Sequence, residues 1–236
     1  QLTDRTANAF RTMKVMERHK GHFYNWYDTE SLKPLLPMYI STVDSGNLAA
    51  HLLTLRAGLI ALPDEPILGS KVFDGLTDTF GVLLDLCGNL HLARLTQIQN
   101  DLEFLCTSRP NTFWAAREGL GRLVASALEV VHGIDSDTDN KATWWANAFA
   151  GQCRAALDEL EYFATWTKLS FSSQTFGGFT GLSEIPSLRQ LSNLDKEILP
   201  AMTDRPGGTP EQSAQLNELR EALVEASLRA RARIGV

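Results

Sequence analysis

With 236 residues, the chain is long enough to bury a substantial core, and its length predicts one domain or two small ones. Apolar residues make up 44% and charged residues 21%, a mixture that excludes wholesale disorder. The formal net charge of -6 argues against nucleic acid or an anionic membrane as a partner. No apolar run reaches the roughly 20 residues that cross a bilayer, so this segment is not expected to insert into a membrane. No signal peptide pattern is visible. Because the chain begins with Gln1 instead of Met, we expect an excised piece of a longer protein or a chain whose start lies outside this sequence.

Helical periodicity dominates the chain and predicts an all-α fold. A first helix is expected from Thr3 or Asp4 to about His19, ended by Gly21. A second helix is expected from Ser45 to Leu62, with Asp44 or Ser45 as its N-cap. The other predicted helices span residues 70–87, 90–108, 111–132, 140–168, 187–192 and 210–234. We expect one all-α domain over 1–236, with a flexible loop at 170–185 and a terminal helix at 209–236. The long helix from residue 140 is expected to lie at the centre of the core.

The segment 21–58 differs in texture from the rest of the chain. Its aromatic residues gather between Phe23 and Tyr39, and Pro34 and Pro37 forbid a regular helix there, so Phe23 to Tyr27 is expected to be extended. Aromatic rings can stack on the apolar faces of a sugar, and Asp, Asn and Ser side chains can bond its hydroxyl groups. The alternative is purely structural, with the aromatic residues as a hydrophobic clip and Asp44 as a helix cap. The residues alone leave both interpretations open.

The string GHFYNWYDTESLKPLLPMYISTVDSGNLAAHL resembles the glucoamylase-like region of cyclic β-1,2-glucan synthases, with Ile40 as the departure from Val in that pattern. The strings PSLRQL and WWANAFAGQC resemble the same region less closely. The resemblance implies part of an (α/α)-barrel that binds β-1,2-glucan and acts as a transglycosylating, cyclising module. It also implies a larger bacterial membrane protein, with this segment soluble on the cytoplasmic side of the inner membrane. Its partners would be β-1,2-glucan, or another glucose-containing oligosaccharide, and the rest of the parent polypeptide.

Carried over residue by residue, the resemblance nominates Asp44 as the catalytic residue. The residues that it nominates for substrate binding are Trp26, Tyr27, Asp28, Ser45 and Asn47. Cleavage or transfer at an anomeric carbon needs two placed carboxyl groups, and Asp28 is only a weaker second candidate. We therefore expect the isolated chain to be an inactive fragment. The competing hypothesis is a non-catalytic helical scaffold or protein-interaction module.

Other patterns predict neither a metal nor a cofactor. The glycine-rich run 176–181 lacks the Gly-Lys-Ser/Thr ending of a phosphate-binding loop. His19 and His22 have no further ligand in reach, and the alternating residues Asp135, Asp137 and Asp139 lack the glycine and glutamate of a calcium loop. The cysteines, Cys87, Cys106 and Cys153, lie within apolar helical patterns and are expected to be buried, reduced thiols.

Overall fold

The computed structural model describes residues 2–87, 92–134, 140–169, 182, 184–203 and 209–235. Over these residues the chain is 77% helical with almost no strand, which confirms the all-α fold class. Membership of an (α/α)-barrel stays a prediction. The chain divides into two compact units, unit 1 over Gln1–Leu62 and unit 2 over Pro63–Val236. The expectation of one domain over the whole chain also stays a prediction, and each unit is described by itself.

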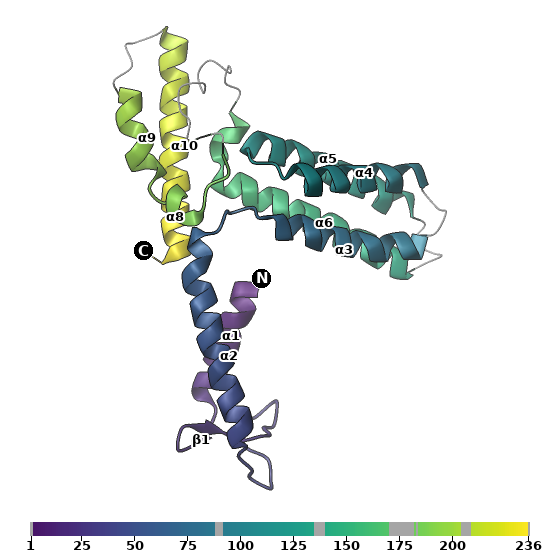
Figure 1. Ribbon diagram of the computed structural model, residues 1–236, viewed down its shortest axis with the longest axis vertical. Helices are drawn as coiled ribbons and strands as arrows, with labels where there is room; N and C mark the ends of the chain where they lie inside the picture. Colours follow the sequence, from purple (N-terminus) through teal and green to yellow (C-terminus); the bar gives the residue numbers. More distant parts are fainter. Residues whose placement is uncertain are drawn as a thin grey trace. The chain divides into compact units, whose positions relative to one another are not determined.

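Unit 1 begins with helix α1 (Leu2–Val15), followed by a short antiparallel hairpin of β1 (Arg18–His19) and β2 (His22–Phe23) (Figure 1). The turn residues Lys20 and Gly21 have φ of 50° and 89°, the pair of positive values that a two-residue hairpin turn requires. Two predictions were therefore wrong. The first helix ends at Val15 instead of His19, and Gly21 belongs to a hairpin turn instead of ending a helix.

Helix α2 (Thr42–Ala61) completes unit 1 and contacts β2. Its N-cap is Ser41, whose extended backbone lets Oγ accept a 3.1 Å hydrogen bond from the backbone N–H of Asp44. The predicted cap at Asp44 or Ser45 was wrong, because the helix begins three residues earlier. No residue of α2 is buried.

Unit 2 is built on helices α3 (Ser70–Cys87), α4 (Leu92–Ser108), α5 (Phe113–Gly133) and α6 (Asn140–Phe163), which run side by side in Figure 1. These elements agree with the predicted helices, apart from the end of α6. The prediction carried that helix to Lys168, but it stops at Phe163 and a 3-10 turn, η2 (Thr165–Lys168), follows.

The remaining helices among the described residues of unit 2 are α8 (Leu188–Leu191), α9 (Leu194–Thr203) and α10 (Pro210–Ile234). A 3-10 turn, η1 (Leu62–Asp64), begins at the last residue of unit 1. Capping boxes start α8 at Ser187 and α10 at Thr209, because each hydroxyl bonds the third backbone N–H of its helix. Helix α9 was not predicted. It has only 10 residues and contains Pro200, so its sequence pattern is weak.

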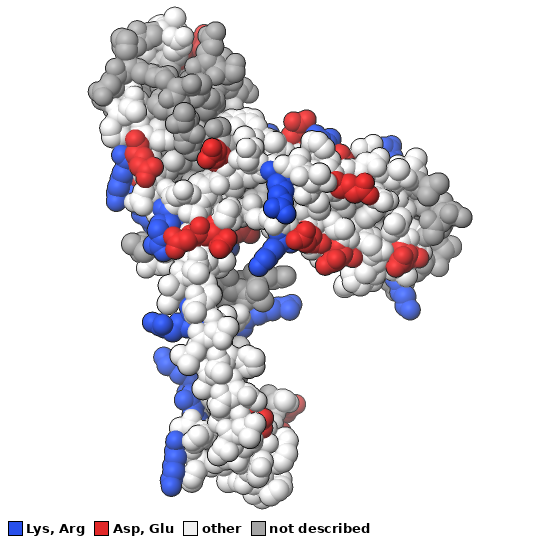
Figure 2. All heavy atoms as spheres, viewed as in Figure 1, with Lys and Arg blue, Asp and Glu red and all other residues white. Residues whose placement is uncertain are grey.

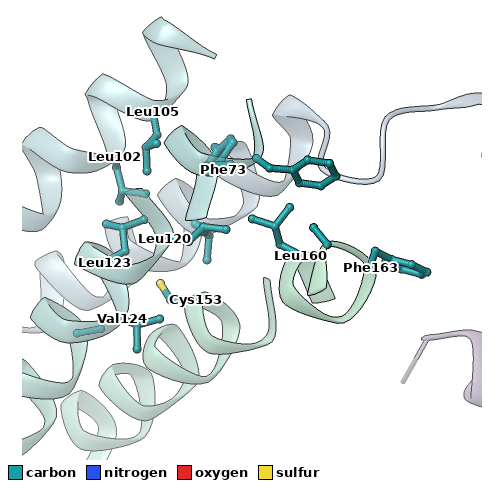
Figure 3. Packing of buried hydrophobic residues seen from close by; sticks show 14 of the residues in the cluster. Phe73, Leu102, Leu105, Leu120, Leu123, Val124, Cys153, Leu160 and Phe163 are labelled. Atoms are coloured by element: carbon teal, nitrogen blue, oxygen red, sulfur yellow. The ribbon is translucent and has the colours of Figure 1, made fainter. Parts of the chain in front are cut away.

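The hydrophobic core of unit 2 lies between α3, α4, α5 and α6 (Figure 3) and continues into η2, α8, α9 and α10. Helix α6 packs against both α3 and α5, which confirms its expected central place. Phe149 of α6 packs against Phe80 of α3 with ring centroids 5.5 Å apart. Cys87 and Cys153 are buried as expected, whereas Cys106 is partly exposed, and none of the three forms a disulfide.

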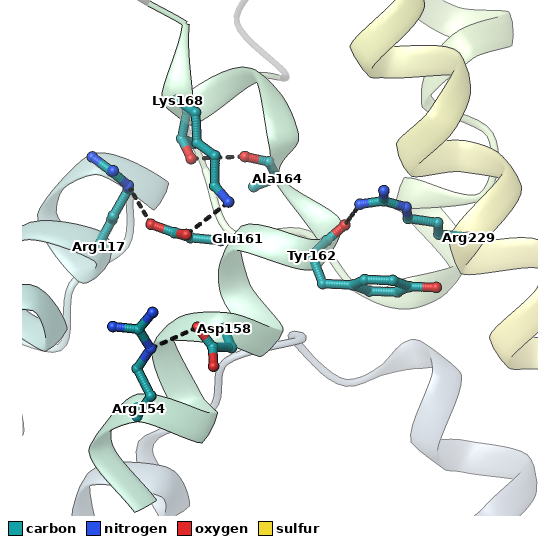
Figure 4. Close-up of polar contacts among 9 residues, drawn as sticks. Arg117, Arg154, Asp158, Glu161, Tyr162, Ala164, Lys168 and Arg229 are labelled. Carbon is teal, nitrogen blue, oxygen red and sulfur yellow. Dashed lines mark hydrogen bonds and ion pairs between the residues drawn. The ribbon is translucent and has the colours of Figure 1, made fainter. Parts of the chain in front are cut away.

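The end of α6 is tied to its neighbours by charged side chains (Figure 4). Glu161 accepts hydrogen bonds from Nε of Arg117 on α5 at 2.9 Å and from Nζ of Lys168 in η2 at 2.8 Å. Burial alone would raise the pKa of Glu161, but the bonds from Lys168 and Arg117 outweigh it and hold that pKa below its usual value. On the other side, Nη1 of Arg229 in α10 donates to the carbonyl oxygen of Tyr162 at 2.6 Å.

Some predictions fall outside the described residues, namely most of the loop at 170–185, the glycine-rich run 176–181 and the three aspartates at 135–139. At the described end of that loop, Leu182 is buried, and the backbone N–H of Ile185 donates to the carbonyl oxygen of Asn111. None of the helices described here combines the length and the apolarity that would carry it across a bilayer.

Candidate functional site

A pocket of about 230 Å³ opens in unit 1 where the chain after the hairpin meets the start of α2. One part of its lining is apolar and the other polar. The residues around it are Phe23, Tyr24, Asn25, Ser41, Asp44, Ser45 and Leu48. The pocket therefore combines the two chemistries that a sugar ring presents, an apolar face and a rim of hydroxyl groups.

Asn25 holds the two walls of this pocket together. Its backbone N–H donates to the carbonyl oxygen of Tyr39 at 2.9 Å, and its Oδ1 accepts from the backbone N–H of Ser41 at 3.1 Å. These bonds join the ends of the segment between Asn25 and Ser41 and fix the residue that caps α2. Asn25 and Tyr24 were not nominated from the sequence as site residues, although both belong to the aromatic string that marked the segment.

Asp44 lies exposed in the first turn of α2, where the helix dipole favours a negative charge. Its backbone N–H is used by the cap, but no donor within the described parts of the chain bonds its carboxylate. Ser45 donates its hydroxyl to the carbonyl oxygen of Ser41 at 2.9 Å, which leaves its oxygen lone pairs to accept from a ligand. Asp44 and Ser45 are thus two predicted residues that the structure brings together.

The predicted aromatic residues lie outside the lining of this pocket. Trp26 is 50% exposed and lies against Tyr39, with ring centroids 6.1 Å apart at an interplanar angle of 31°. The hydroxyl of Tyr27 is occupied, since it donates to the carbonyl oxygen of Glu17 at 2.6 Å and accepts from the backbone N–H of Tyr24 at 2.9 Å. Tyr27 therefore fastens the hairpin, whereas Trp26 keeps an exposed ring.

Asp28 and Asn47 do not line the pocket either. Oδ1 of Asp28 accepts from the backbone N–H of Ser31 at 2.6 Å and from its hydroxyl at 2.7 Å, and these bonds lower the pKa of the carboxyl group. Asp28 therefore stabilises its own turn, and Asn47 lies exposed on α2. The ligand roles of Trp26, Tyr27, Asp28 and Asn47 stay predictions.

A second, shallower pocket of about 600 Å³ adjoins the first and shares Phe23, Ser45 and Leu48 with it. The hairpin contributes Arg18, Lys20, Gly21 and His22 to this pocket, and α2 contributes small and apolar residues. The two hollows together offer room beyond a single sugar unit. Where the structure describes the chain, no group of three or more His, Cys, Asp or Glu residues is arranged to hold a metal ion.

Comparison with known proteins gives one informative relative. No protein-family model matches the chain. Over 89 residues, or 36% of the chain, it is 34% identical to the cyclic β-(1,2)-glucan synthase NdvB of Rhizobium meliloti (strain 1021). The chain is similar to a segment of that synthase. The match covers 3% of the relative's length, so the relation holds for a local stretch only.

The number of carboxyl groups in the pocket limits the chemistry that it can carry out. Displacement at an anomeric carbon uses two carboxyl groups, roughly 5 to 10 Å apart depending on the mechanism. Among the residues that line the pocket, Asp44 is the one that carries a carboxylate. This arrangement suits recognition of a neutral, hydroxyl-rich ligand, and it supplies half of the acid–base pair that a reaction would need.

Proposed function

We propose that this chain is the glucan-binding part of a protein related to cyclic β-1,2-glucan synthases. Its ligand is β-1,2-glucan or another glucose-containing oligosaccharide. The observation that carries the proposal is the carboxylate of Asp44, exposed and without a donor among the described residues, in a pocket walled by Phe23 and Tyr24. The local similarity to the Rhizobium synthase supports the choice of ligand.

Each group has a distinct part in this proposal. The rings of Phe23 and Tyr24 contact the apolar face of a glucose unit, as aromatic rings do in carbohydrate sites. The carboxylate of Asp44 accepts hydrogen bonds from the hydroxyl groups of the sugar, and Ser45 adds a further acceptor. The exposed ring of Trp26, beside Tyr39, offers stacking surface for a neighbouring glucose unit.

In the complete protein, Asp44 acts as one of two carboxyl groups in transglycosylation and ring closure of the glucan, and the second group comes from outside this chain. The parent is a bacterial membrane protein that holds this segment on the cytoplasmic side of the inner membrane. The isolated chain binds glucan without turning it over, because one carboxylate cannot supply both the acid and the base or nucleophile.

Isothermal titration calorimetry of the whole chain with β-1,2-gluco-oligosaccharides tests the proposal. Asp44→Asn removes the charge but keeps the size of the side chain. Because a hydrogen bond to a charged group contributes about 1.5–3 kcal/mol, we expect the Kd to rise by roughly ten- to a hundredfold. The matched control is Glu30→Gln, which removes an exposed carboxylate of the same unit outside the pocket and should leave the Kd unchanged.

The specificity arm uses maltooligosaccharides of the same length, which should bind more weakly. If titration with the β-1,2-linked ligand gave no heat of binding, the proposal would be wrong. If Asp44→Asn and Glu30→Gln weakened the affinity for the oligosaccharide equally, the assignment of the binding site to this pocket would be wrong. An assay for newly released reducing ends should give no signal with the isolated chain, and turnover by that chain would contradict the fragment interpretation.

A further inference from the structure

Helix α2 carries a leucine seam that the described residues of unit 1 do not fully cover. The leucine seam consists of Leu48, Leu52, Leu55, Leu59 and Leu62, which follow one another at alternating spacings of four and three residues. This spacing aligns side chains along one face of a helix and is the pattern by which two helices pack knobs into holes. Leu62 follows α2 directly and keeps helical dihedral angles of -53° and -38°, so the face continues to that residue.

The hairpin covers only the first half of the leucine seam. Leu48 and Leu52 are half-buried and line the hollow beside the hairpin. Leu55, Leu59 and Leu62 are 39%, 52% and 58% exposed. In Figure 2 the length of α2 is covered mainly by uncharged residues. A row of exposed leucines on a helix with few charged residues is typical of a surface that associates with another apolar face.

The residues beside the leucine seam indicate the charge of the partner. In the heptad frame set by the leucines, the flanking positions are Ala49, His51, Arg56 and Gly58, none of which is acidic. A second copy of α2 would place no acidic residue opposite Arg56, because a parallel copy would bring His51 there and an antiparallel copy another Arg56. Glutamate or aspartate at the facing positions would instead form ion pairs with Arg56 and add specificity.

We propose that the leucine seam is a docking surface for a partner helix that carries leucines at the same alternating spacing and acidic residues beside them. The partner helix lies outside this chain and is not a second copy of it. Residue 58 is a glycine with open space where a Cβ would stand, so the partner can approach closely near the end of α2. This inference is independent of the glucan proposal, because Leu55, Leu59 and Leu62 line neither pocket of the candidate site.

Fluorescence anisotropy of the full chain with two synthetic helical peptides tests the docking surface. Both peptides have three heptads with leucine at the seam positions, and they differ only in carrying glutamate or lysine at the flanking positions. We expect the glutamate peptide to bind at least tenfold more tightly than the lysine peptide. Arg56→Glu should reverse this preference, and the double substitution Leu55→Asn with Leu59→Asn should abolish binding.

Leu53→Asn is the matched control, because Leu53 is 68% exposed on α2 but lies off the leucine seam. It should bind the glutamate peptide as the unaltered chain does, and circular dichroism should show the same helix content for every variant. Equal binding of both peptides, loss of binding in Leu53→Asn, or no binding at all would overturn the proposal. So would a dimer of the chain in analytical ultracentrifugation that the double substitution abolishes. Asp44→Asn should leave peptide binding unchanged, so failure of the docking surface is distinguishable from failure of the glucan site.

Discussion

Replacing Gly119 of α5 with alanine would place a methyl group against Leu105 of α4. A Cβ at this position would lie 2.5 Å from Cδ2 of Leu105, and 3.2 Å and 3.3 Å from its Cδ1 and Cγ. Carbon atoms in contact are normally about 3.5–4.0 Å apart, so Leu105 would have to move. Leu105 is only 1% exposed and is enclosed by the core, so its movement would disturb other side chains.

The size of the effect follows from two opposing contributions. Overpacking a close-packed core costs about 1–3 kcal/mol, whereas alanine in place of glycine inside a helix gains up to about 1 kcal/mol. We therefore expect Gly119→Ala to lower the free energy of unfolding by roughly 0–2 kcal/mol. Gly121→Ala is the internal standard, because a Cβ at Gly121 meets nothing within 4 Å on the same helix. Gly121→Ala should therefore raise the free energy of unfolding through the helix preference of alanine alone. The free energies of unfolding of the two variants should differ by roughly 1–3 kcal/mol.

Urea unfolding followed by circular dichroism at 222 nm measures both variants. A second comparison uses Leu105→Ala, which removes the three atoms that the new methyl group would meet. In that background, Gly119→Ala should cost less than it does in the unaltered chain, and the difference is the coupling energy of the pair. If Gly119→Ala and Gly121→Ala shifted the unfolding midpoint equally, the close approach of α5 to Leu105 would be refuted.

Two further predictions concern polar contacts in each unit. Tyr27→Phe removes the hydroxyl that donates to the carbonyl oxygen of Glu17, and should destabilise unit 1 by roughly 1–3 kcal/mol, seen as faster hydrogen exchange in the hairpin. Because the pKa of Glu161 is lower when folded than its usual value of 4.5, its contribution to the stability of unit 2 is present above that value and is lost as the pH falls below it. Glu161→Gln should therefore flatten the acid-side fall in the urea midpoint; an unchanged slope would mean that Lys168 and Arg117 do not stabilise the carboxylate.

The helices that the sequence predicted best are those whose signals are local. Helix α3 has buried residues at helical spacing, from Phe73 and Leu76 to Leu83, and α10 begins with a capping box at Thr209 followed by Pro210. Such signals depend on neighbouring residues only, and one sequence is enough to read them. The end of α1 was misjudged because the residues after Val15 pair across the hairpin, and that pairing is not marked by the sequence around the helix itself.

The sequence nominated those residues of the pocket whose position follows from a local signal, and it missed those placed by contacts between distant parts of the chain. Asp44 and Ser45 stand at the start of a helix, a position that the sequence shows, and the structure places both in the pocket. Asn25 was missed because its importance comes from a hydrogen bond to Ser41, 16 residues further along the chain. Tyr27 was nominated as an aromatic ligand, but its hydroxyl is bonded to Glu17, a contact that no local pattern reveals.

The hydrogen bonds of Asn25 with Tyr39 and Ser41 close the neck of the segment between them. Between those two ends of the segment, Ser31 donates hydrogen bonds to the carboxylate of Asp28 and holds the turn that follows it. Tyr27 and Pro34 form an isolated antiparallel β-bridge. The residues between Asn25 and Tyr39 can therefore change in length or composition without shifting Ser41, the N-cap of α2, or the carboxylate of Asp44. Such an arrangement allows residues 26–38 to vary or to be replaced while the pocket beside Asp44 keeps its form.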